Sequence, residues 1–223
     1  MNKQVLVIAA HPDDEVIGCG GTLAHHAAVG DIINIIFLAD GESSRSGQQA
    51  SIEKRQAMAR NAASILGCHE PIFLGLADNQ LDTLPFLHIV KTLEQATHKL
   101  APSVIYTHHG GDLNIDHRLT CQATLTAFRP QPGCGVQSIY AFDISSSTEW
   151  SHPSLTPPFQ PQRFHDISPW LAIKEAALTC YQSEMREKPH SRSIDGIRYR
   201  DLHRGHTVGC HAAEAFEVIR EIW

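Results

Sequence analysis

The stretch VLVIAAHPDDEVIGCGG (residues 5–21) changes character abruptly, because an apolar run ends in a histidine, a proline and three consecutive acids. A short unbroken apolar run is typical of a strand that is buried on both faces of a parallel sheet. Three adjacent carboxylates repel one another, so something positive must offset their charge at the end of such a strand. Because Pro12 holds the chain in a turn, we expect His11 and Asp14 to fold back toward one point while Asp13 points another way.

Apolar strand-like runs and longer helical patterns alternate along the first two thirds of the chain. Strands are expected at 5–9, 32–39, 71–75, 103–108 and 136–143, and helices at 20–29, 51–67, 84–100 and 116–128. Short strands separated by helices of this length indicate a parallel sheet covered on both faces. The sequence therefore predicts an α/β fold, a Rossmann-like three-layer sandwich with a mostly parallel sheet.

The pattern becomes irregular in residues 129–169, where serine, proline and threonine are frequent and Trp150 is expected to be exposed. A long irregular segment inside a compact domain is often a lid or a binding loop, and an ordinary surface loop is the alternative. Two further helices are expected at 169–185 and 211–223. The stretch between them, 190–209, is basic and contains glycine, and it is expected to be a connection.

Length and composition limit the possible classes of protein. The 223 residues suit one domain, 1–223, and a formal net charge of −6 without a basic run argues against a nucleic-acid partner. The apolar run before His11 is too short for a signal peptide or a membrane span, so we expect no membrane partner and a cytoplasmic location. The partner should be a small-molecule substrate, and a homo-oligomer is left open. The six cysteines include no CxxC pair, so no role is assigned to them.

A second polar cluster, GGDLNIDH (residues 110–117), follows the fourth expected strand. In an open parallel sheet, ligands bind outside the carboxyl ends of the strands where the strand order reverses, so the two polar motifs should face each other there. Two histidines and one carboxylate form a common ligand set of catalytic zinc. The sequence therefore predicts a Zn²⁺ site. Taken separately, Asp13 or Asp14 could instead cap the first helix, and Asp116 could cap the later one.

The chain also resembles a known family, the PIG-L/LmbE zinc-dependent de-N-acetylases. The motifs that carry the resemblance are AHPDDE (10–15), GGDLNIDH (110–117), YQSE (181–184) and AEAF (213–216). The resemblance covers nearly the whole chain. It implies that His11, Asp14 and His117 bind zinc and that Asp13 is the general base.

One position departs from the pattern of several family members, which carry a histidine three residues before the late zinc ligand. This chain has Asn114 there. An amide donates a hydrogen bond but cannot act as a general acid. We therefore expect Asn114 to serve as a neutral donor to the oxyanion, with His108 or His109 as alternative sources of a proton.

The expected substrate contacts are less specific than the metal ligands. By resemblance, Arg55 reaches the sugar or the groups attached to it, whereas alone it would be read as a solvated helix residue. Asp112 could accept sugar hydroxyls or form a turn after two glycines. Arg192 and Arg204 either bind a phosphate or pair with nearby acids.

The favoured function is the removal of acetyl from an N-acetylated amino sugar, as a glycoside or linked to a nucleotide, with release of acetate and a free amine. An amidase acting on a larger thiol conjugate is one alternative. A non-catalytic, Rossmann-like nucleotide-binding protein that uses GCGG (18–21) is another. That motif is weak, because it lacks G-x-G-x-x-G and follows an acidic loop that would repel a pyrophosphate.

Overall fold

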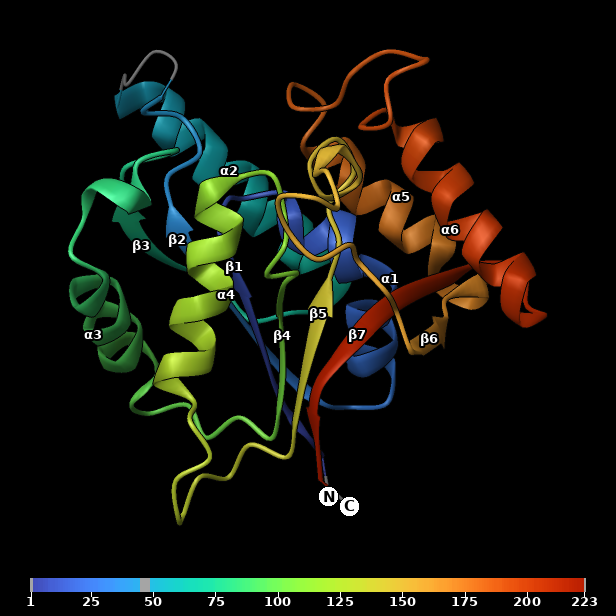
Figure 1. Ribbon diagram of the computed structural model, residues 1–223. Coiled ribbons are helices and arrows are strands. Elements are labelled where there is room, and N and C mark those ends of the chain that lie inside the picture. Colours follow the sequence, from blue (N-terminus) through green and yellow to red (C-terminus); the bar gives the residue numbers. More distant parts are fainter. Residues whose placement is uncertain (1, 45–48, 223) are drawn as a thin grey trace.

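The computed structural model describes residues 2–44 and 49–222. Within them the strands form one seven-stranded sheet with the order β3-β2-β1-β4-β5-β7-β6 (Figure 1). The strands are β1 (Gln4–Ala9), β2 (Ile32–Ala39), β3 (Ile72–Leu76), β4 (Val104–His108), β5 (Ser138–Phe142), β6 (Arg163–Asp166) and β7 (Ala213–Glu221). Strands β1 to β5 pair in parallel, whereas β7 is antiparallel to β5 and β6. The sheet is therefore mostly parallel, and the predicted α/β class is confirmed.

Helices cover both faces of the sheet. They are α1 (Asp14–Ala28), α2 (Gln49–Leu66), α3 (Phe86–Thr97), α4 (Ile115–Ala127), α5 (Leu171–Cys180) and α6 (Ile194–Val208). Helices α1, α2, α5 and α6 pack against one face, and α3 and α4 pack against the other (Figure 1). None of the helices in the described part of the chain is both long and apolar enough to cross a membrane.

Strand β1 shows why its sequence is continuously apolar. Val5 and Val7 belong to the core under α1, α2, α5 and α6, whereas Leu6 and Ile8 belong to the core under α3 and α4. Successive side chains of a strand point to opposite faces, so a strand covered on both sides needs apolar residues at every position. This strand lies in the middle of the parallel part of the sheet, which fixes the place of the acidic motif that follows it.

Helix α1 begins earlier than predicted, within the acidic motif, and it bends at Cys19, where φ is −147°. Glycines at the bend allow close packing. A Cβ atom at Gly18 would lie 2.4 Å from the ring of Phe142, and one at Gly21 would lie 2.7 Å from Ile167. The glycines of GCGG therefore serve contacts between α1 and its neighbours, which removes the main support for a nucleotide-binding motif.

The predicted helix at 211–223 was wrong, because this stretch forms β7. Alanine and glutamate favour a helix locally, but such propensities are weak compared with tertiary packing. Here the chain fills the position between β5 and β6 and buries Phe216. Pairing with two strands at once decides the conformation.

The stretch 190–209 was expected to be a connection, and it contains α6 instead. Ser193 caps the helix, since its hydroxyl accepts a hydrogen bond from the N–H of Gly196 at 2.9 Å. Gly209 ends the helix in the left-handed region with φ 85°. Both capping residues are visible in the sequence, so the helix could have been found from them.

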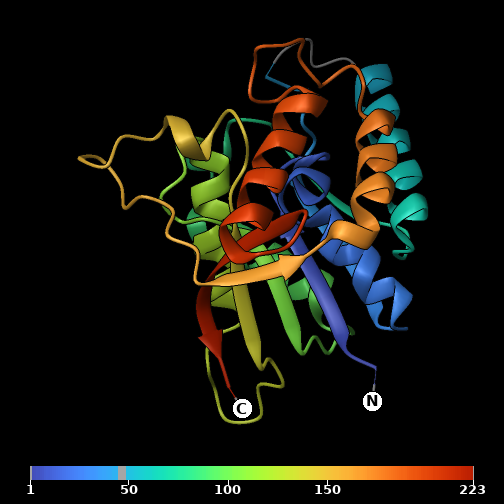
Figure 2. The ribbon, with the colours of Figure 1, turned by 90° about the vertical axis from the view of Figure 1, so that its right-hand side faces the viewer.

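The predicted lid has two irregular parts, residues 129–137 before β5 and the longer residues 143–162 between β5 and β6. Figure 2 shows the longer part, coloured yellow to orange, projecting from the body of the molecule. Near the start of the longer part, the hydroxyls of Ser147 and Thr148 both donate to the carboxylate of Asp112. Strand β6 ends the segment, for which a loop or a hairpin was expected.

A buried ion cluster joins α1, α5, α6 and β7. The Nζ atom of Lys174 lies 2.6 Å from a carboxylate oxygen of Asp201 and 2.7 Å from one of Glu214. Glu214 also accepts the backbone N–H groups of Gly21, at 2.9 Å, and Thr22, at 2.7 Å. The three charged side chains are fully buried, so each depends on the others for its charge balance.

Replacing Lys174 by alanine should lower the free energy of unfolding by about 3–5 kcal/mol, because two carboxylates then stay buried without their cation. Urea unfolding followed by circular dichroism measures this loss. Arg60→Ala is the matched control, since it removes an exposed pair with Glu70 and should cost less than about 1 kcal/mol. Equal losses in the two variants would contradict this account of the cluster.

Candidate active site

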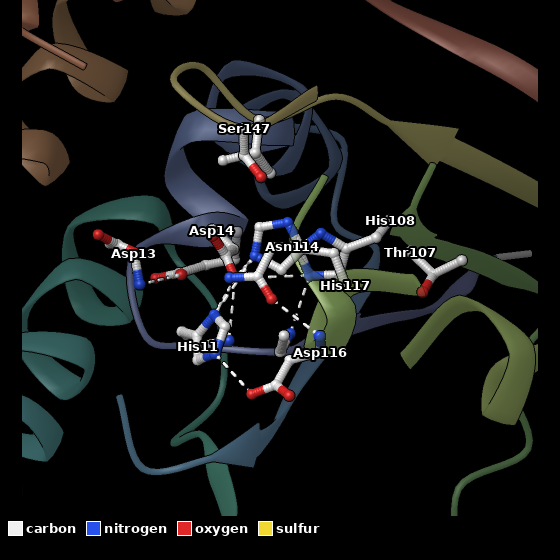
Figure 3. A network of polar contacts seen from close by, with 12 residues as sticks. His11, Asp13, Asp14, Thr107, His108, Asn114, Asp116, His117 and Ser147 are labelled. Atoms are coloured by element: carbon white, nitrogen blue, oxygen red, sulfur yellow. Dashed lines mark hydrogen bonds and ion pairs between the residues drawn. The ribbon is translucent and has the colours of Figure 1, made fainter. Parts of the chain in front are cut away.

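The two polar motifs meet where the strand order reverses. Strand β1 lies between β2 and β4, and the chain moves outward to β3 before it returns to β4 on the other side. His11 follows β1, and His117 lies in the first turn of α4, which follows β4. Figure 3 shows side chains from both motifs pointing toward one another. This is the position at which open α/β sheets bind ligands.

Three side-chain atoms form a nearly equilateral triangle. The Nδ1 atom of His11 lies 3.3 Å from Asp14 Oδ2, and His117 Nε2 lies 3.4 Å from the same oxygen and 3.3 Å from His11 Nδ1. All three residues are buried. Ligands held about 2.0–2.1 Å from a tetrahedral zinc ion are about 3.3 Å apart, so the triangle fits such an ion. The structure thus brings together the three residues predicted as metal ligands.

Carboxylates lie beside the outer nitrogens of both histidines. His11 Nε2 lies 3.1 Å from Asp116 Oδ2 and 3.0 Å from Asp78 Oδ1, and His117 Nδ1 lies 3.2 Å from Asp112 Oδ1. A carboxylate on the outer nitrogen fixes the ring and makes the inner nitrogen a better ligand. Asp78 was missed by sequence reasoning, because it follows a different strand and no motif marks it.

The charges of the cluster act on one another. Burial alone would raise the pKa of Asp14, but the charges of His117 and His108 hold it well below its usual value. Burial lowers the pKa of His117, and the carboxylates of Asp14 and Asp112 outweigh it and raise the value to about 9. A metal ion at this cluster therefore competes with a proton near neutral pH.

Asp13 has a positive φ angle, and its carboxylate forms ion pairs with two arginines. Its φ of 120° is strained for a residue with a side chain, and its N–H donates to the carboxylate of Glu15 at 3.0 Å. Its Oδ2 atom lies 2.6 Å from Arg192 Nη2 and 3.2 Å from Arg55 Nη2. Among the described residues, Oδ1 of the same carboxylate has no hydrogen-bond partner. One oxygen is thus held by the two arginines, whereas the other is buried without a hydrogen-bond partner among the described residues.

The arginines singled out in the sequence all pair with acids. Arg192 contacts Asp13, and Arg204 lies 2.6 Å from Asp143. Arg55 is buried and also lies 2.5 Å from Glu184. Reading Arg55 as a solvated helix residue was therefore wrong.

Asn114 lines the cavity beside the cluster, whereas Asp112 is buried away from it. Asn114 Oδ1 accepts the N–H of Asp116 at 2.8 Å and so caps α4, while the residue also lines the cavity beside the cluster. Asp112 is fully buried and does not line that cavity. Its oxygens accept hydrogen bonds from Ser147 and Thr148. The predicted contact between Asp112 and sugar hydroxyls finds no support, because the carboxylate faces the protein interior.

The two histidines considered as proton sources do not face the cavity. The ring of His108 stacks on that of His117, with centroids 4.1 Å apart, and burial and the charge of His117 lower its pKa. His109 contacts Glu217 at 2.6 Å and the carbonyl oxygen of Pro157 at 2.9 Å, so both of its ring nitrogens are engaged. Neither residue lines the cavity.

The cavity beside the cluster has a volume of about 290 Å³ and a mostly polar wall. The residues that line it are His11, Gly41, Ser44, Arg55, Asp78, Asn79, Asn114, His117, Ser146, Ser147, Trp150, Glu184, Arg186, His190 and Arg192. Three of them, Ser146, Ser147 and Trp150, belong to the segment predicted as a lid or binding loop. Those missed by sequence reasoning include Asp78, Asn79 and His190, and the basic composition of the loop before α6 was the signal available for His190.

The fold and the His/Asp cluster define an α/β protein with a set of residues that could hold a metal ion at the ends of its parallel strands. The sequence model of GlcNAc-PI de-N-acetylase, PIG-L, matches residues 6–128, more than half of the chain. The uncharacterized deacetylase YaiS of Escherichia coli strain K12 is 33% identical over 187 residues, which are 81% of this chain and 91% of that protein. The chain therefore belongs to the PIG-L family.

Two further relatives agree with this assignment. The 1D-myo-inositol 2-acetamido-2-deoxy-alpha-D-glucopyranoside deacetylase of Thermobifida fusca strain YX is 28% identical over 57% of this chain and 54% of its own. The solved structure of the conserved protein TT1542 from Thermus thermophilus is similar with a TM-score of 0.79 and 26% identity, covering 99% of this chain and 96% of that one. The expected family and enzyme class, a metal-dependent deacetylase, are confirmed.

Metal binding to the cluster should release protons at pH 7, because the pKa of His117 is raised to about 9, that of His11 is raised well above its usual value, and both ligating nitrogens must be neutral to bind. Affinity should therefore rise between pH 7 and pH 9. Calorimetric titration of the metal-free protein with Zn²⁺, in two buffers of different ionisation enthalpy, counts the protons. The exposed His98→Ala variant should behave like the unaltered protein, and an affinity independent of pH would contradict the prediction.

Proposed function

We propose that this protein is a zinc-dependent hydrolase that removes the N-acetyl group from an N-acetylated amino sugar, present as a glycoside or linked to a nucleotide. The observation that carries the proposal is the triangle of ligand atoms, with sides of 3.3–3.4 Å, at a polar cavity. The family assignment supports the reaction. The Thermobifida relative, named for a 2-acetamido-2-deoxy-glucopyranoside, supports the substrate class.

In this proposal His11, Asp14 and His117 hold the zinc ion, since two histidines and one carboxylate are a common set in catalytic zinc sites. When bound, zinc polarises the acetyl carbonyl and lowers the pKa of a neighbouring water molecule. Asp116 and Asp112 position the two histidines through their outer nitrogens. The carboxylate of Asp112 thus acts on the ligand rather than on the substrate.

Asp13 is proposed as the general base. Its unpartnered Oδ1 takes a proton from the attacking water as the oxygen of that water bonds to the acetyl carbon. The same carboxyl then delivers the proton to the sugar nitrogen as the C–N bond breaks, which gives acetate and a free amine. Arg192 and Arg55 hold Oδ2 throughout, so the carboxylate keeps its orientation.

Asn114 is proposed as the neutral donor to the developing oxyanion. Its Oδ1 is committed to the N–H of Asp116, so its amide N–H group is the part of the side chain available to the cavity. Such a donor, placed where charge develops, typically contributes about 100-fold or more in rate. Arg55 lines the same cavity and is proposed to contact the substrate on the side of Glu184.

The test is a panel of N-acetyl amino sugars in free, glycosidic and nucleotide-linked forms, each incubated with zinc-loaded protein. Release of primary amine is measured with and without a chelator. We expect release from one group of substrates that stops with chelator and returns when Zn²⁺ is added back. No release from any of them, with one zinc bound per chain, would reject the amino-sugar substrate and favour an amide of a larger thiol conjugate.

Asp13→Asn should keep zinc but lower kcat by about 100-fold or more, because the amide cannot accept the proton from water. His117→Ala should lose both zinc and turnover. Zinc content by mass spectrometry and the initial rate of amine release distinguish the two variants. Full activity in Asp13→Asn would remove this residue from the role of base.

A further inference from the structure

The YQSE motif begins directly after α5 and reaches Asp13 through two of its side chains. Its ends belong to one turn, in which the N–H of Glu184 donates to the carbonyl oxygen of Tyr181 at 2.8 Å. Glu184 contacts one guanidinium nitrogen of Arg55, and another lies 3.2 Å from Asp13 Oδ2. Tyr181 contacts Glu15, which in turn contacts the backbone of Asp13. The first contact is part of the proposed function, and the second is not.

The backbone of Asp13 depends on such a contact, because its φ is 120° and its ψ is −24°. A residue with a side chain rarely adopts a positive φ of this kind, and the surrounding structure must offset the cost. The N–H of Asp13 donates to Glu15 Oε2 at 3.0 Å. Rotation about φ changes the direction of the side chain relative to this N–H, so a fixed N–H limits where the carboxylate can lie.

Glu15 is itself fixed by Tyr181. The hydroxyl of Tyr181 donates to Glu15 Oε1 at 2.7 Å, and both side chains are fully buried. The two oxygens of one carboxyl group thus contact the tyrosine and the backbone of Asp13. A buried polar network in which every member is paired is rigid. Neither Tyr181 nor Glu15 lines the cavity, so any effect on the reaction passes through Asp13.

We propose that Tyr181 and Glu15 are positioning residues for Asp13: they hold its backbone at a positive φ and so keep its carboxylate in the orientation that the reaction needs. This inference rests on the proposed function, in which Asp13 is the general base. A base must lie within hydrogen-bond reach of the proton that it takes, so a small rotation of the turn lowers the rate rather than the affinity for substrate.

The test compares two variants, each loaded with zinc, in kcat, KM and zinc content. Tyr181→Phe removes only the hydroxyl and should lower kcat about tenfold. Glu15→Met removes the acceptor of the Asp13 N–H at similar side-chain volume and should lower kcat about 100-fold. KM and zinc content should change less than about twofold, because the proposed metal ligands and the lining of the cavity are unaltered.

Glu15→Gln is the conservative variant, and it should keep kcat within about threefold of the unaltered protein. Its amide oxygen can accept the N–H of Asp13 while its amide nitrogen donates to the hydroxyl of Tyr181. Tyr106→Phe is the matched control. Tyr106 is also buried, and its hydroxyl contacts His26 Nε2 at 3.0 Å, away from the acidic motif. Its loss should leave kcat unchanged.

Three results would overturn the proposal. A structural role alone would lower the free energy of unfolding and the zinc content of Tyr181→Phe but leave kcat per bound zinc unchanged. A rise in KM at unchanged kcat would assign the pair to substrate binding. A Glu15→Gln variant no more active than Glu15→Met would show that the two hydrogen bonds are not what the reaction needs.

Hydrogen exchange separates this inference from the proposed function. NMR follows the exchange of the Asp13 amide with solvent deuterium in the zinc-loaded protein. Exchange should be slow in the unaltered protein and in Glu15→Gln, and about tenfold or more faster in Tyr181→Phe and Glu15→Met. Faster exchange in these two variants, without amine release by the unaltered protein, would keep the control of the Asp13 backbone and reject the deacetylase. Amine release with kcat and exchange unchanged in both variants would do the reverse.

Discussion

Three adjacent acids are buried at one strand end, and each is stabilised by a different kind of partner. Asp14 lies against His11 and His117, and Asp13 lies against Arg192 and Arg55. Burial raises the pKa of Glu15 to about 8, so its carboxyl is largely protonated at neutral pH and adds little repulsion. Because their partners differ, the three neighbouring acids can be buried together, and the His/Asp cluster and the Asp13 contacts both depend on this arrangement.

Asp112 links the metal cluster to the wall of the cavity. One of its oxygens lies beside His117, and its carboxylate accepts the hydroxyls of Ser147 and Thr148. The 3-10 turn that these hydroxyls hold ends at Trp150, on the rim of the cavity. Packing of the irregular segment and orientation of the His117 ring are therefore coupled through one buried carboxylate. Ser146, Ser147 and Trp150, which lie within the predicted lid, line the cavity of the site.

The GCGG glycines have a packing role in the folded protein that their sequence pattern does not indicate. In sequence they allow a phosphate loop, but in the structure they let α1 approach Phe142 and Ile167 closely. The carboxylate of Glu214 accepts backbone N–H groups of this same bend, so an anion of the protein itself already uses them. Close helix packing here keeps Asp14, in the first turn of α1, at the end of β1.

The sequence by itself determined the parallel sheet and the meeting of HPDDE with Asn114 and His117, because strands of one direction end at the same edge of a sheet. It did not reveal β7, the role of Asp78, the contact of Tyr181 with Glu15 or the pairing of Arg192 with Asp13. Those depend on contacts between segments far apart in the chain, which no local period or motif records. Tertiary packing overrode weak helix propensity at β7 and brought Arg192, in the loop before α6, to Asp13 of the acidic motif.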